Sequence, residues 1–281
     1  MKTIKLITLL ALVIFAASCK KDKQKETLCK VTTIITGNDS IIIQYNSSNK
    51  VSSIRSINTP DSLNMSFVND GIFHKQTITE NNAVLPAFTI NYSLNAAGSI
   101  DKFQQTIINI ASVYVNNFRC KYDNEGHLII HENKVTKSGF PFSYKKDSSV
   151  YENGNMTKLY RFRSLAGDTT SVTLYSTTLI TYTASNNTLG LYGNQIINPN
   201  NIEGTSTFYL NNFPYILHLY GKGNKNLPAS SATTFSSGAA GYTLNYEYTI
   251  DSNNLITSQT INRTPTAVSF PKISRFYYAC N

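Results

Sequence analysis

The chain has 281 residues, of which 11% are aromatic and only 15% are charged, and its formal net charge is +9. Much of that charge lies near the N-terminus, and the remainder is scattered, with Lys145-Lys146 and Arg161-x-Arg163 as its densest points. A nucleic-acid site needs a continuous basic stripe with interleaved aromatic residues. We therefore expect no nucleic-acid partner and interpret the scattered charges as a solvated face.

Residues 1–18 have the pattern of an export signal. Two lysines precede an apolar run from Leu6 to Ala17, which is too short to cross a bilayer as a helix. The small residues 16–18 precede Cys19 and resemble the lipobox of bacterial lipoproteins, whose cysteine is acylated and becomes the mature N-terminus. Ala16 stands where that motif usually has leucine, so an ordinary signal peptide is the alternative. We expect a lipoprotein signal peptide over 1–18 and lipidation at Cys19.

The segment after the signal predicts a membrane tether. Residues 19–27 are charged and lack apolar side chains after Cys19, so they cannot bury surface and should be disordered. Their lysines are placed to contact anionic headgroups beside the lipid anchor. No linker divides residues 28–281, which we expect to form a single β domain, although the length also leaves room for two small ones.

The remaining sequence repeats one local pattern: an aromatic residue, a short polar turn and an aliphatic residue. Before the clearest copy, apolar Phe118, Cys120 and Tyr122 alternate with basic residues, which is the period of a strand with one buried face. Asp and Asn in the turn bond their own backbone and Gly accepts positive φ, so the chain can reverse there. The copies are Tyr45-NSSNK-Val51, Phe67-VNDG-Ile72, Tyr92-SLNAAGS-Ile100, Tyr122-DNEGH-Leu128, Tyr151-ENGN-Met156, Tyr182-TASNNT-Leu189 and Tyr248-TIDSNN-Leu255.

This pattern predicts an all-β fold, namely an antiparallel meander of successive hairpins with little helix. The sheet is expected to curl into a barrel or a half-barrel, with one apolar and one wet face. The predicted turns lie near 46–50, 69–71, 95–99, 123–126, 152–155, 185–188 and 251–254.

One stretch departs from the pattern. Residues 221–241 are mostly small, and a structureless loop of that length is uncommon unless it is functional or disordered. We interpret it as a candidate lid or binding loop, with a plain surface loop as the alternative. Tyr246 and Tyr248, on a concave face near this loop, are the candidate ligand contacts.

The titratable residues form no recognisable catalytic site. Most acidic residues lie in turn-like clusters, where Asp has a structural role, and the common hydrolase motifs are missing from the sequence. His127 and His131 lie four apart on one expected strand, but the neighbouring Glu132 should point to the opposite face. We expect no metal, no cofactor and no enzymatic activity, and interpret both histidines as exposed.

Three cysteines remain after Cys19. Cys120 shares the apolar face of its strand and is expected to be buried and free. Cys29 and Cys280 lie in alternating stretches near the two ends of the domain, and an exported protein can oxidise them. Because domain termini are often close together, we expect Cys29 and Cys280 to form a disulfide.

The segment Tyr122-Asp123-x-x-Gly126-x-Leu128 resembles the centre of YD-type repeats, the hairpin units of large bacterial surface and toxin shells. Only this copy matches well, with Asp directly after the aromatic residue and Gly three residues later. The whole layout, with its Cys-Lys-Lys-Asp start and series of Tyr-turn-Leu hairpins, is similar to Bacteroidota outer-membrane lipoproteins of unknown function. The resemblance implies outer-membrane anchoring and a large antiparallel sheet, and it transfers no catalytic residues.

Together these patterns predict a lipid-anchored outer-membrane protein that faces the periplasm or the cell surface. Its role is expected to be binding or scaffolding, with the membrane as a partner through the lipid anchor and a lipid or a glycan as the ligand. An envelope hydrolase, with a site assembled from distant loops, is the alternative.

Overall fold

The computed structural model confirms the all-β class. Within the residues it describes there are strands and turns but no helix, and hence none long and apolar enough to cross a membrane. The chain divides into two compact units, Met1–Lys30 with Tyr278–Asn281 and Val31–Tyr277. The described residues are 29–37, 39–47, 51–57, 62–69, 73–80, 88–109, 112–165, 168, 171–187, 221–267 and 270–280.

The described residues form sixteen strands. In chain order they are β1 (Cys29–Thr36), β2 (Asp39–Tyr45), β3 (Val51–Ile57), β4 (Ser62–Asn69), β5 (Phe73–Glu80), β6 (Phe88–Leu94), β7 (Ile100–Asn109), β8 (Ser112–Tyr122), β9 (Leu128–Lys137), β10 (Phe140–Glu152), β11 (Asn155–Leu165), β12 (Thr173–Asn186), β13 (Asn226–Phe235), β14 (Tyr242–Ile250), β15 (Ile256–Thr264) and β16 (Lys272–Cys280).

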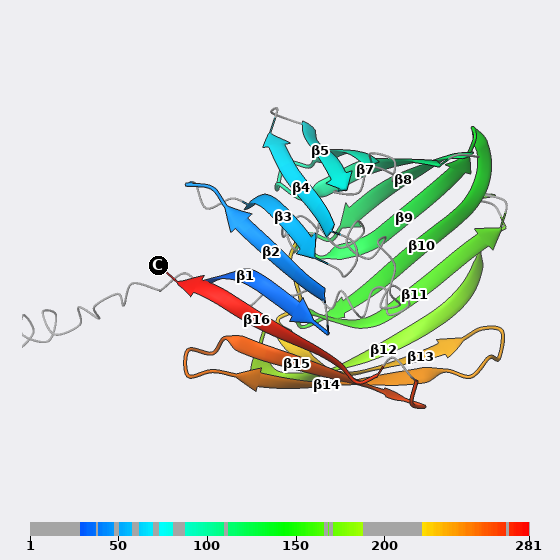
Figure 1. The fold of residues 1–281 in the computed structure, drawn as a ribbon. Coiled ribbons are helices and arrows are strands. Elements are labelled where there is room, and N and C mark those ends of the chain that lie inside the picture. Colours follow the sequence, from blue (N-terminus) through cyan, green and yellow to red (C-terminus); the bar gives the residue numbers. More distant parts are fainter. Residues whose placement is uncertain are drawn as a thin grey trace, which may run out of the picture. The chain divides into compact units, whose positions relative to one another are not determined.

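These strands form one antiparallel meander that closes into a barrel. Each strand pairs with its neighbours in sequence, and β16 returns to lie beside β1 (Figure 1). Two side-chain bonds support this last pairing. Thr36 and Ser274 share a hydrogen bond of 2.8 Å between their hydroxyls, and the Thr32 hydroxyl donates to the Tyr277 carbonyl at 3.3 Å. Of the two predicted forms, barrel and half-barrel, the sheet adopts the closed one.

The predicted turns agree with the observed hairpins at most positions. The turns at 95–99, 123–126, 152–155 and 251–254 each join two paired strands. The strands around 46–50 and 69–71 also pair, although residues 48–50 and 70–72 lie outside the described residues. At 185–188, β12 ends at Asn186 and pairs with β13, and residue 188 lies outside the described residues.

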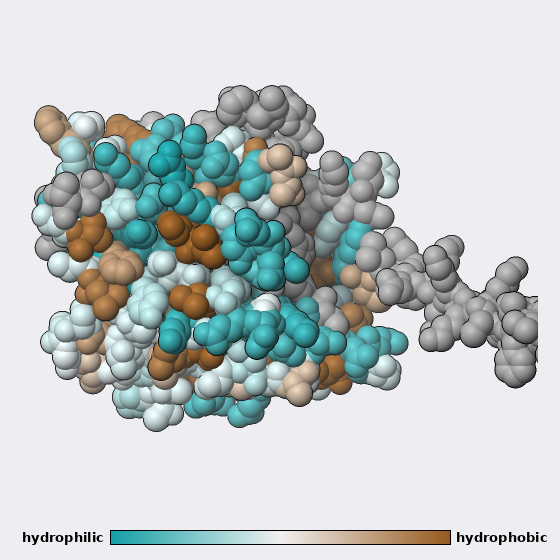
Figure 2. Space-filling model, turned by 180° about the vertical axis from the view of Figure 1, so that it is seen from behind, coloured by the Kyte–Doolittle hydropathy of each residue, from teal (hydrophilic) through white to brown (hydrophobic). Residues whose placement is uncertain are grey.

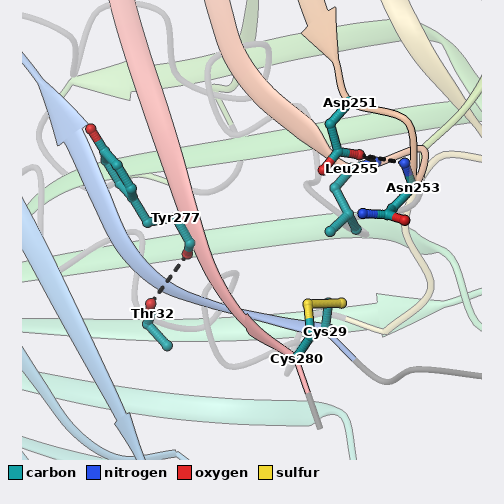
Figure 3. Close-up of a disulfide and its surroundings, with 7 residues drawn as sticks. All are labelled: Cys29, Thr32, Asp251, Asn253, Leu255, Tyr277 and Cys280. Carbon is teal, nitrogen blue, oxygen red and sulfur yellow. Dashed lines mark hydrogen bonds between the residues drawn. A yellow bond between two sulfur atoms is a disulfide. The ribbon is translucent and has the colours of Figure 1, made fainter.

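Three of these turns are stabilised by the same pattern of hydrogen bonds. A side-chain oxygen accepts hydrogen bonds from the amides two and four residues later, and the residue three positions later has positive φ. In the last of them, the Asp251 carboxylate accepts from the amides of Asn253 and Leu255, both at 2.9 Å (Figure 3). The other two turns begin at Asn95 and Asp123. The Asp-x-x-Gly pattern in the sequence therefore encodes a specific hydrogen-bonded turn.

All of these hairpin turns lie at one end of the barrel, which we call the turn end, because alternate connections of a meander share an end. The first strand residues after the turns are buried, with exposed fractions of 0% for Ile100, 5% for Leu128 and 1% for Ile256. Tyrosines bond across hairpins: the Tyr122 hydroxyl donates to the Ile100 carbonyl at 2.8 Å. An apolar layer thus fills the interior at the turn end.

The prediction of a long loop over 221–241 is wrong, because residues 226–235 of it form strand β13. Small side chains are needed there: Ser231 and Thr233 are buried and face the interior opposite bulky residues of β14. Ser231 also shares a hydrogen bond of 3.0 Å with the Tyr246 hydroxyl. At Gly241, a Cβ atom would lie only 2.3 Å from the Thr233 carbonyl oxygen, so this position requires glycine.

Cys29 and Cys280 form a disulfide, with their Cα atoms 4.1 Å apart (Figure 3). Cys29 is the first residue of β1 and Cys280 is the last residue of β16. Cys120 is a buried free cysteine, and burial raises the pKa of its thiol to about 12. The thiolate of Cys120 is therefore not populated at neutral pH.

Replacement of Cys29 and Cys280 by serine removes a cross-link that spans 251 residues. The chain-entropy model assigns about 5 kcal/mol to a loop of this length, so we expect the melting temperature to fall by roughly 10 °C or more. Calorimetry of the chain from residue 28 onward, oxidised and reduced, measures this. Three titratable thiols in the oxidised, denatured protein, where we expect one, would rule the disulfide out.

Replacement of Asp251 by alanine should destabilise the fold by about 1–3 kcal/mol, because two turn amides lose their acceptor. Asp251→Asn is the matched control, since Asn95 supports the same turn with an amide oxygen. Urea denaturation compares the two variants. Equal stability of Asp251→Ala and Asp251→Asn would show that the side-chain oxygen is not needed.

Candidate functional site

The outward face of the barrel carries polar residues on β8 and β14, together with exposed apolar side chains such as Leu179 on β12 and Ile273 on β16. On β14 the outward residues Asn245 and Glu247 are exposed, while Leu244 and Tyr246, which alternate with them, are buried. On β8 the outward residues are Asn117, Arg119 and Lys121, all exposed. Figure 2 shows one face of the molecule, where hydrophobic residues form separate patches among hydrophilic ones.

The inward residues are apolar in one part of the barrel and charged in another. At the turn end and on β12 to β15 it is a core of aliphatic and aromatic side chains, which includes Met156, Leu159, Ile180, Leu244 and Ile261. On β10 and β11, further from the turn end, the inward residues are charged. They are Lys145 and Asp147 on β10 and Arg161 and Arg163 on β11, and we call these four residues the interior charged patch.

Strand register places the four charges beside one another. Lys145 lies directly opposite Arg163, and Asp147 lies directly opposite Arg161. The inward direction follows from Arg161, which is only 5% exposed and shares the face of Leu159, which is 0% exposed. The interpretation of the scattered basic residues as a solvated face is therefore wrong for Arg161, since period-two spacing placed it inside a closed sheet.

The interior charged patch has more positive than negative groups. Arg161 Nε lies 3.9 Å from Asp147 Oδ1, and the two side chains are 7% and 21% exposed. Burial raises the pKa of Asp147 to about 6, although Arg161, Arg163 and Lys145 all act to lower it. Burial and the charge of Arg163 lower the pKa of Lys145, while Asp147 acts in the opposite direction. The patch thus holds three basic groups around one carboxylate.

Two side chains of β12, Tyr175 and Ser176, lie next to the patch. The guanidinium of Arg163 lies over the Tyr175 ring, 3.7 Å from its centre. Ser176, directly opposite Arg161, has a buried hydroxyl with no hydrogen-bond partner among the described residues. Lys145 is exposed despite its inward position, so solvent reaches the interior beside it. The arrangement offers an accessible ammonium, a stacked guanidinium and an unused hydroxyl.

Neither histidine is exposed, so that interpretation is wrong: His127 is buried and His131 is half-buried. His127 belongs to the turn, where its Nδ1 lies 3.0 Å from Asp123 Oδ2 and its ring stacks on Tyr151. His131 faces inward and stacks on Phe118, and burial lowers its pKa to about 4, which leaves it neutral. The described residues contain no group of three potential metal ligands.

The candidate ligand contacts Tyr246 and Tyr248 both face the interior. Tyr246 is 6% exposed and belongs to the apolar core, where its hydroxyl is bonded to Ser231. The Tyr248 hydroxyl accepts a hydrogen bond from Gln259 at 3.3 Å. A ligand contact at either residue stays a prediction, as does lipidation of Cys19, which lies outside the described residues.

Two hollows open on the described surface. One, of about 550 Å³, is lined by residues of β6 to β10, among them Lys102, Arg119 and Glu132. The other, of about 480 Å³, lies at the turn end and is lined by His127, Lys222 and Asn224 among others. Most of their charged groups are surrounded by water, which weakens any charge interaction there.

No protein-family model and no curated protein matches this sequence. Two crystal structures of porin-like proteins share its fold. The one from Bacteroides uniformis has 12% sequence identity and a TM-score of 0.60, with 89% of this chain and 95% of that chain covered. The one from Bacteroides vulgatus has 13% identity and a TM-score of 0.58, with 90% and 99% covered. At such low identity the likeness shows a shared fold and nothing finer.

The raised pKa of Asp147 predicts how stability depends on pH. Because the folded value of about 6 exceeds the ordinary value of 3.8, the stabilisation gained from protonation is present below pH 4 and is lost as the pH rises through 6. Relative to Asp147→Asn, the wild-type protein should lose up to about 3 kcal/mol between pH 4 and 7. Urea denaturation across this range measures the difference. Asp101→Asn, at an exposed carboxylate, is the control, and parallel curves for wild type and Asp147→Asn would contradict the prediction.

Proposed function

We propose that this chain is a lipid-anchored protein of the outer membrane whose barrel stands in water and binds a ligand in its interior. The observation that carries the proposal is the distribution of polarity: charged and amide side chains occupy outward positions of β8 and β14, and charged side chains also line part of the interior. The porin-like neighbours support an envelope location. The lipobox-like residues before Cys19 support the anchor.

The outward residues argue against a barrel embedded in lipid. A membrane barrel has an outward apolar band about 25 Å tall, and Arg or Lys on its lipid face costs about 2–4 kcal/mol near the midplane. Here Arg119 and Lys121 project outward from β8, and β14 and β15 present Asn245, Glu247 and Asn262. Glu247 and Asn262 are hydrogen-bonded to each other at 3.2 Å, which suits a surface in water.

Binding or scaffolding is favoured over catalysis. The group with the most perturbed environment in the patch is Asp147. The charges that act on its pKa come from Arg161, Arg163 and Lys145, which do not accept protons at neutral pH, and the neutral imidazole of His131 lies opposite it on β9. General acid–base chemistry needs a second group of suitable pKa within hydrogen-bond reach. An envelope hydrolase remains the second candidate, and the pair of the partly exposed Asp123 and the buried His127 is the observation that favours it.

The anchored, water-surrounded barrel is tested by membrane partition. The full chain should remain with the membrane fraction and carry an acylated N-terminus by mass spectrometry, whereas Cys19→Ala should be unacylated. The chain from residue 28 onward should be monodisperse without detergent, because charged and amide side chains occupy outward positions of β8 and β14. A barrel that stays folded only in detergent would overturn the proposal.

The non-enzymatic role is tested with glycosidase, esterase and peptidase substrates on the same purified chain. We expect no turnover above that of a denatured sample. Turnover that disappears in His127→Ala or Asp123→Asn, with the fold retained by circular dichroism, would establish the hydrolase instead.

A further inference from the structure

We propose that Lys145 and Arg163 together bind a soluble oxyanion, a carboxylate or a phosphate group, inside the barrel. This inference rests on the proposed function and names the chemical class of its ligand.

The proposal of an oxyanion site rests on the register of β10 and β11. Lys145 and Arg163 are directly opposite each other on neighbouring strands, where side chains lie closest across a sheet. Like charges at such positions destabilise a sheet, and natural sequences usually avoid them. The one carboxylate of the patch, Asp147, lies opposite Arg161 rather than between Lys145 and Arg163. An anion bound at this pair would convert its repulsion into attraction.

The local chemistry suits an oxyanion. An arginine guanidinium presents several N–H donors in a rigid fork that matches carboxylate and phosphate oxygens. The Tyr175 ring lies against the guanidinium of Arg163 and holds its plane. The ammonium of Lys145 adds a mobile charge, and its exposure shows that a solute in water can reach it. The unpartnered Ser176 hydroxyl, opposite Arg161 on β12, is a further donor of the patch.

The interior position reduces the screening of part of the patch. Arg163 is partly buried beside Arg161, which is 5% exposed, so water screens these guanidinium groups less than it screens the surface lysines, while Lys145 stays open to solvent. The ligand is therefore expected to be a small molecule with an acidic group, such as a sugar acid or a sugar phosphate.

The experiment uses the folded chain from residue 28 onward with inorganic phosphate, galacturonate and galactose as probes, in chloride buffers of equal ionic strength. Calorimetric titration should show binding of phosphate or galacturonate, at least ten-fold weaker in Lys145→Gln and in Arg163→Gln. Lys146→Gln, on the outward face of the same strand, is the matched control and should bind as the wild type does. Asp147→Asn should bind several-fold more tightly, because it removes the competing negative charge.

Thermal unfolding without the probes separates binding from folding. Lys145→Gln should melt at the wild-type temperature or above it, since it relieves repulsion, and it should lose the rise in melting temperature that phosphate gives the wild type. Vesicles containing phosphatidylglycerol, compared with pure phosphatidylcholine, distinguish a lipid phosphate from a soluble one, and only the soluble probes are expected to bind.

The inference is overturned if neither anion binds the wild type, or if Lys145→Gln and Lys146→Gln bind equally well. Binding of galactose alone would refute the oxyanion and leave a ligand-binding barrel. A barrel that needs detergent would instead refute the proposed function itself.

Discussion

Pairing between the first and last strands is the constraint on which the rest of this structure depends. An open sheet of this size would expose two rows of backbone donors and acceptors, and closure removes both edges. The Thr36–Ser274 and Thr32–Tyr277 bonds belong to this pairing, and the disulfide joins the first residue of β1 to the last residue of β16. Once the sheet closes, each side chain must face either the interior or the outside.

Because of that division, the period-two pattern decides which residues line the interior and which face outward. On β14 the pattern places Leu244 in the core and Glu247 in water, as in any sheet with one wet face. On β10 and β11 the same pattern places charges inside, where they are costly unless another group compensates them. The apolar inward side chains accordingly lie at the turn end and along β12 to β15, and the charged inward side chains lie on β10 and β11. The repulsion between Lys145 and the directly opposite Arg163 is one such cost, and the proposed oxyanion would offset it.

Local patterns predicted the fold well and the site poorly. Asx-type turns and aromatic-aliphatic alternation depend on neighbouring residues, so the hairpins at Asp123 and Asp251 could be read directly. The strand over 226–235 was missed because Ser231 and Thr233 are small only to complement Tyr242 and Leu244, which come later in the chain. His127 and Arg161 were placed on the surface because burial of a polar residue depends on partners such as Asp123 and Asp147. The spacing of Arg161 and Arg163 did contain the signal, since two residues apart on a strand means one shared face.

The central claim is that the outward face of the anchored barrel meets water while its charged interior stays available to a ligand. Site-directed spin labels test it most directly, with cysteine in place of Arg119, Asn245 or Thr260, the residue opposite Glu247, in the full chain prepared with membranes. Power-saturation measurements compare collisions with oxygen, which concentrates in lipid, and with a polar nickel chelate, which stays in water. The account predicts high nickel accessibility at all three positions. Oxygen-dominated relaxation at these positions would place the strands in the bilayer and contradict it.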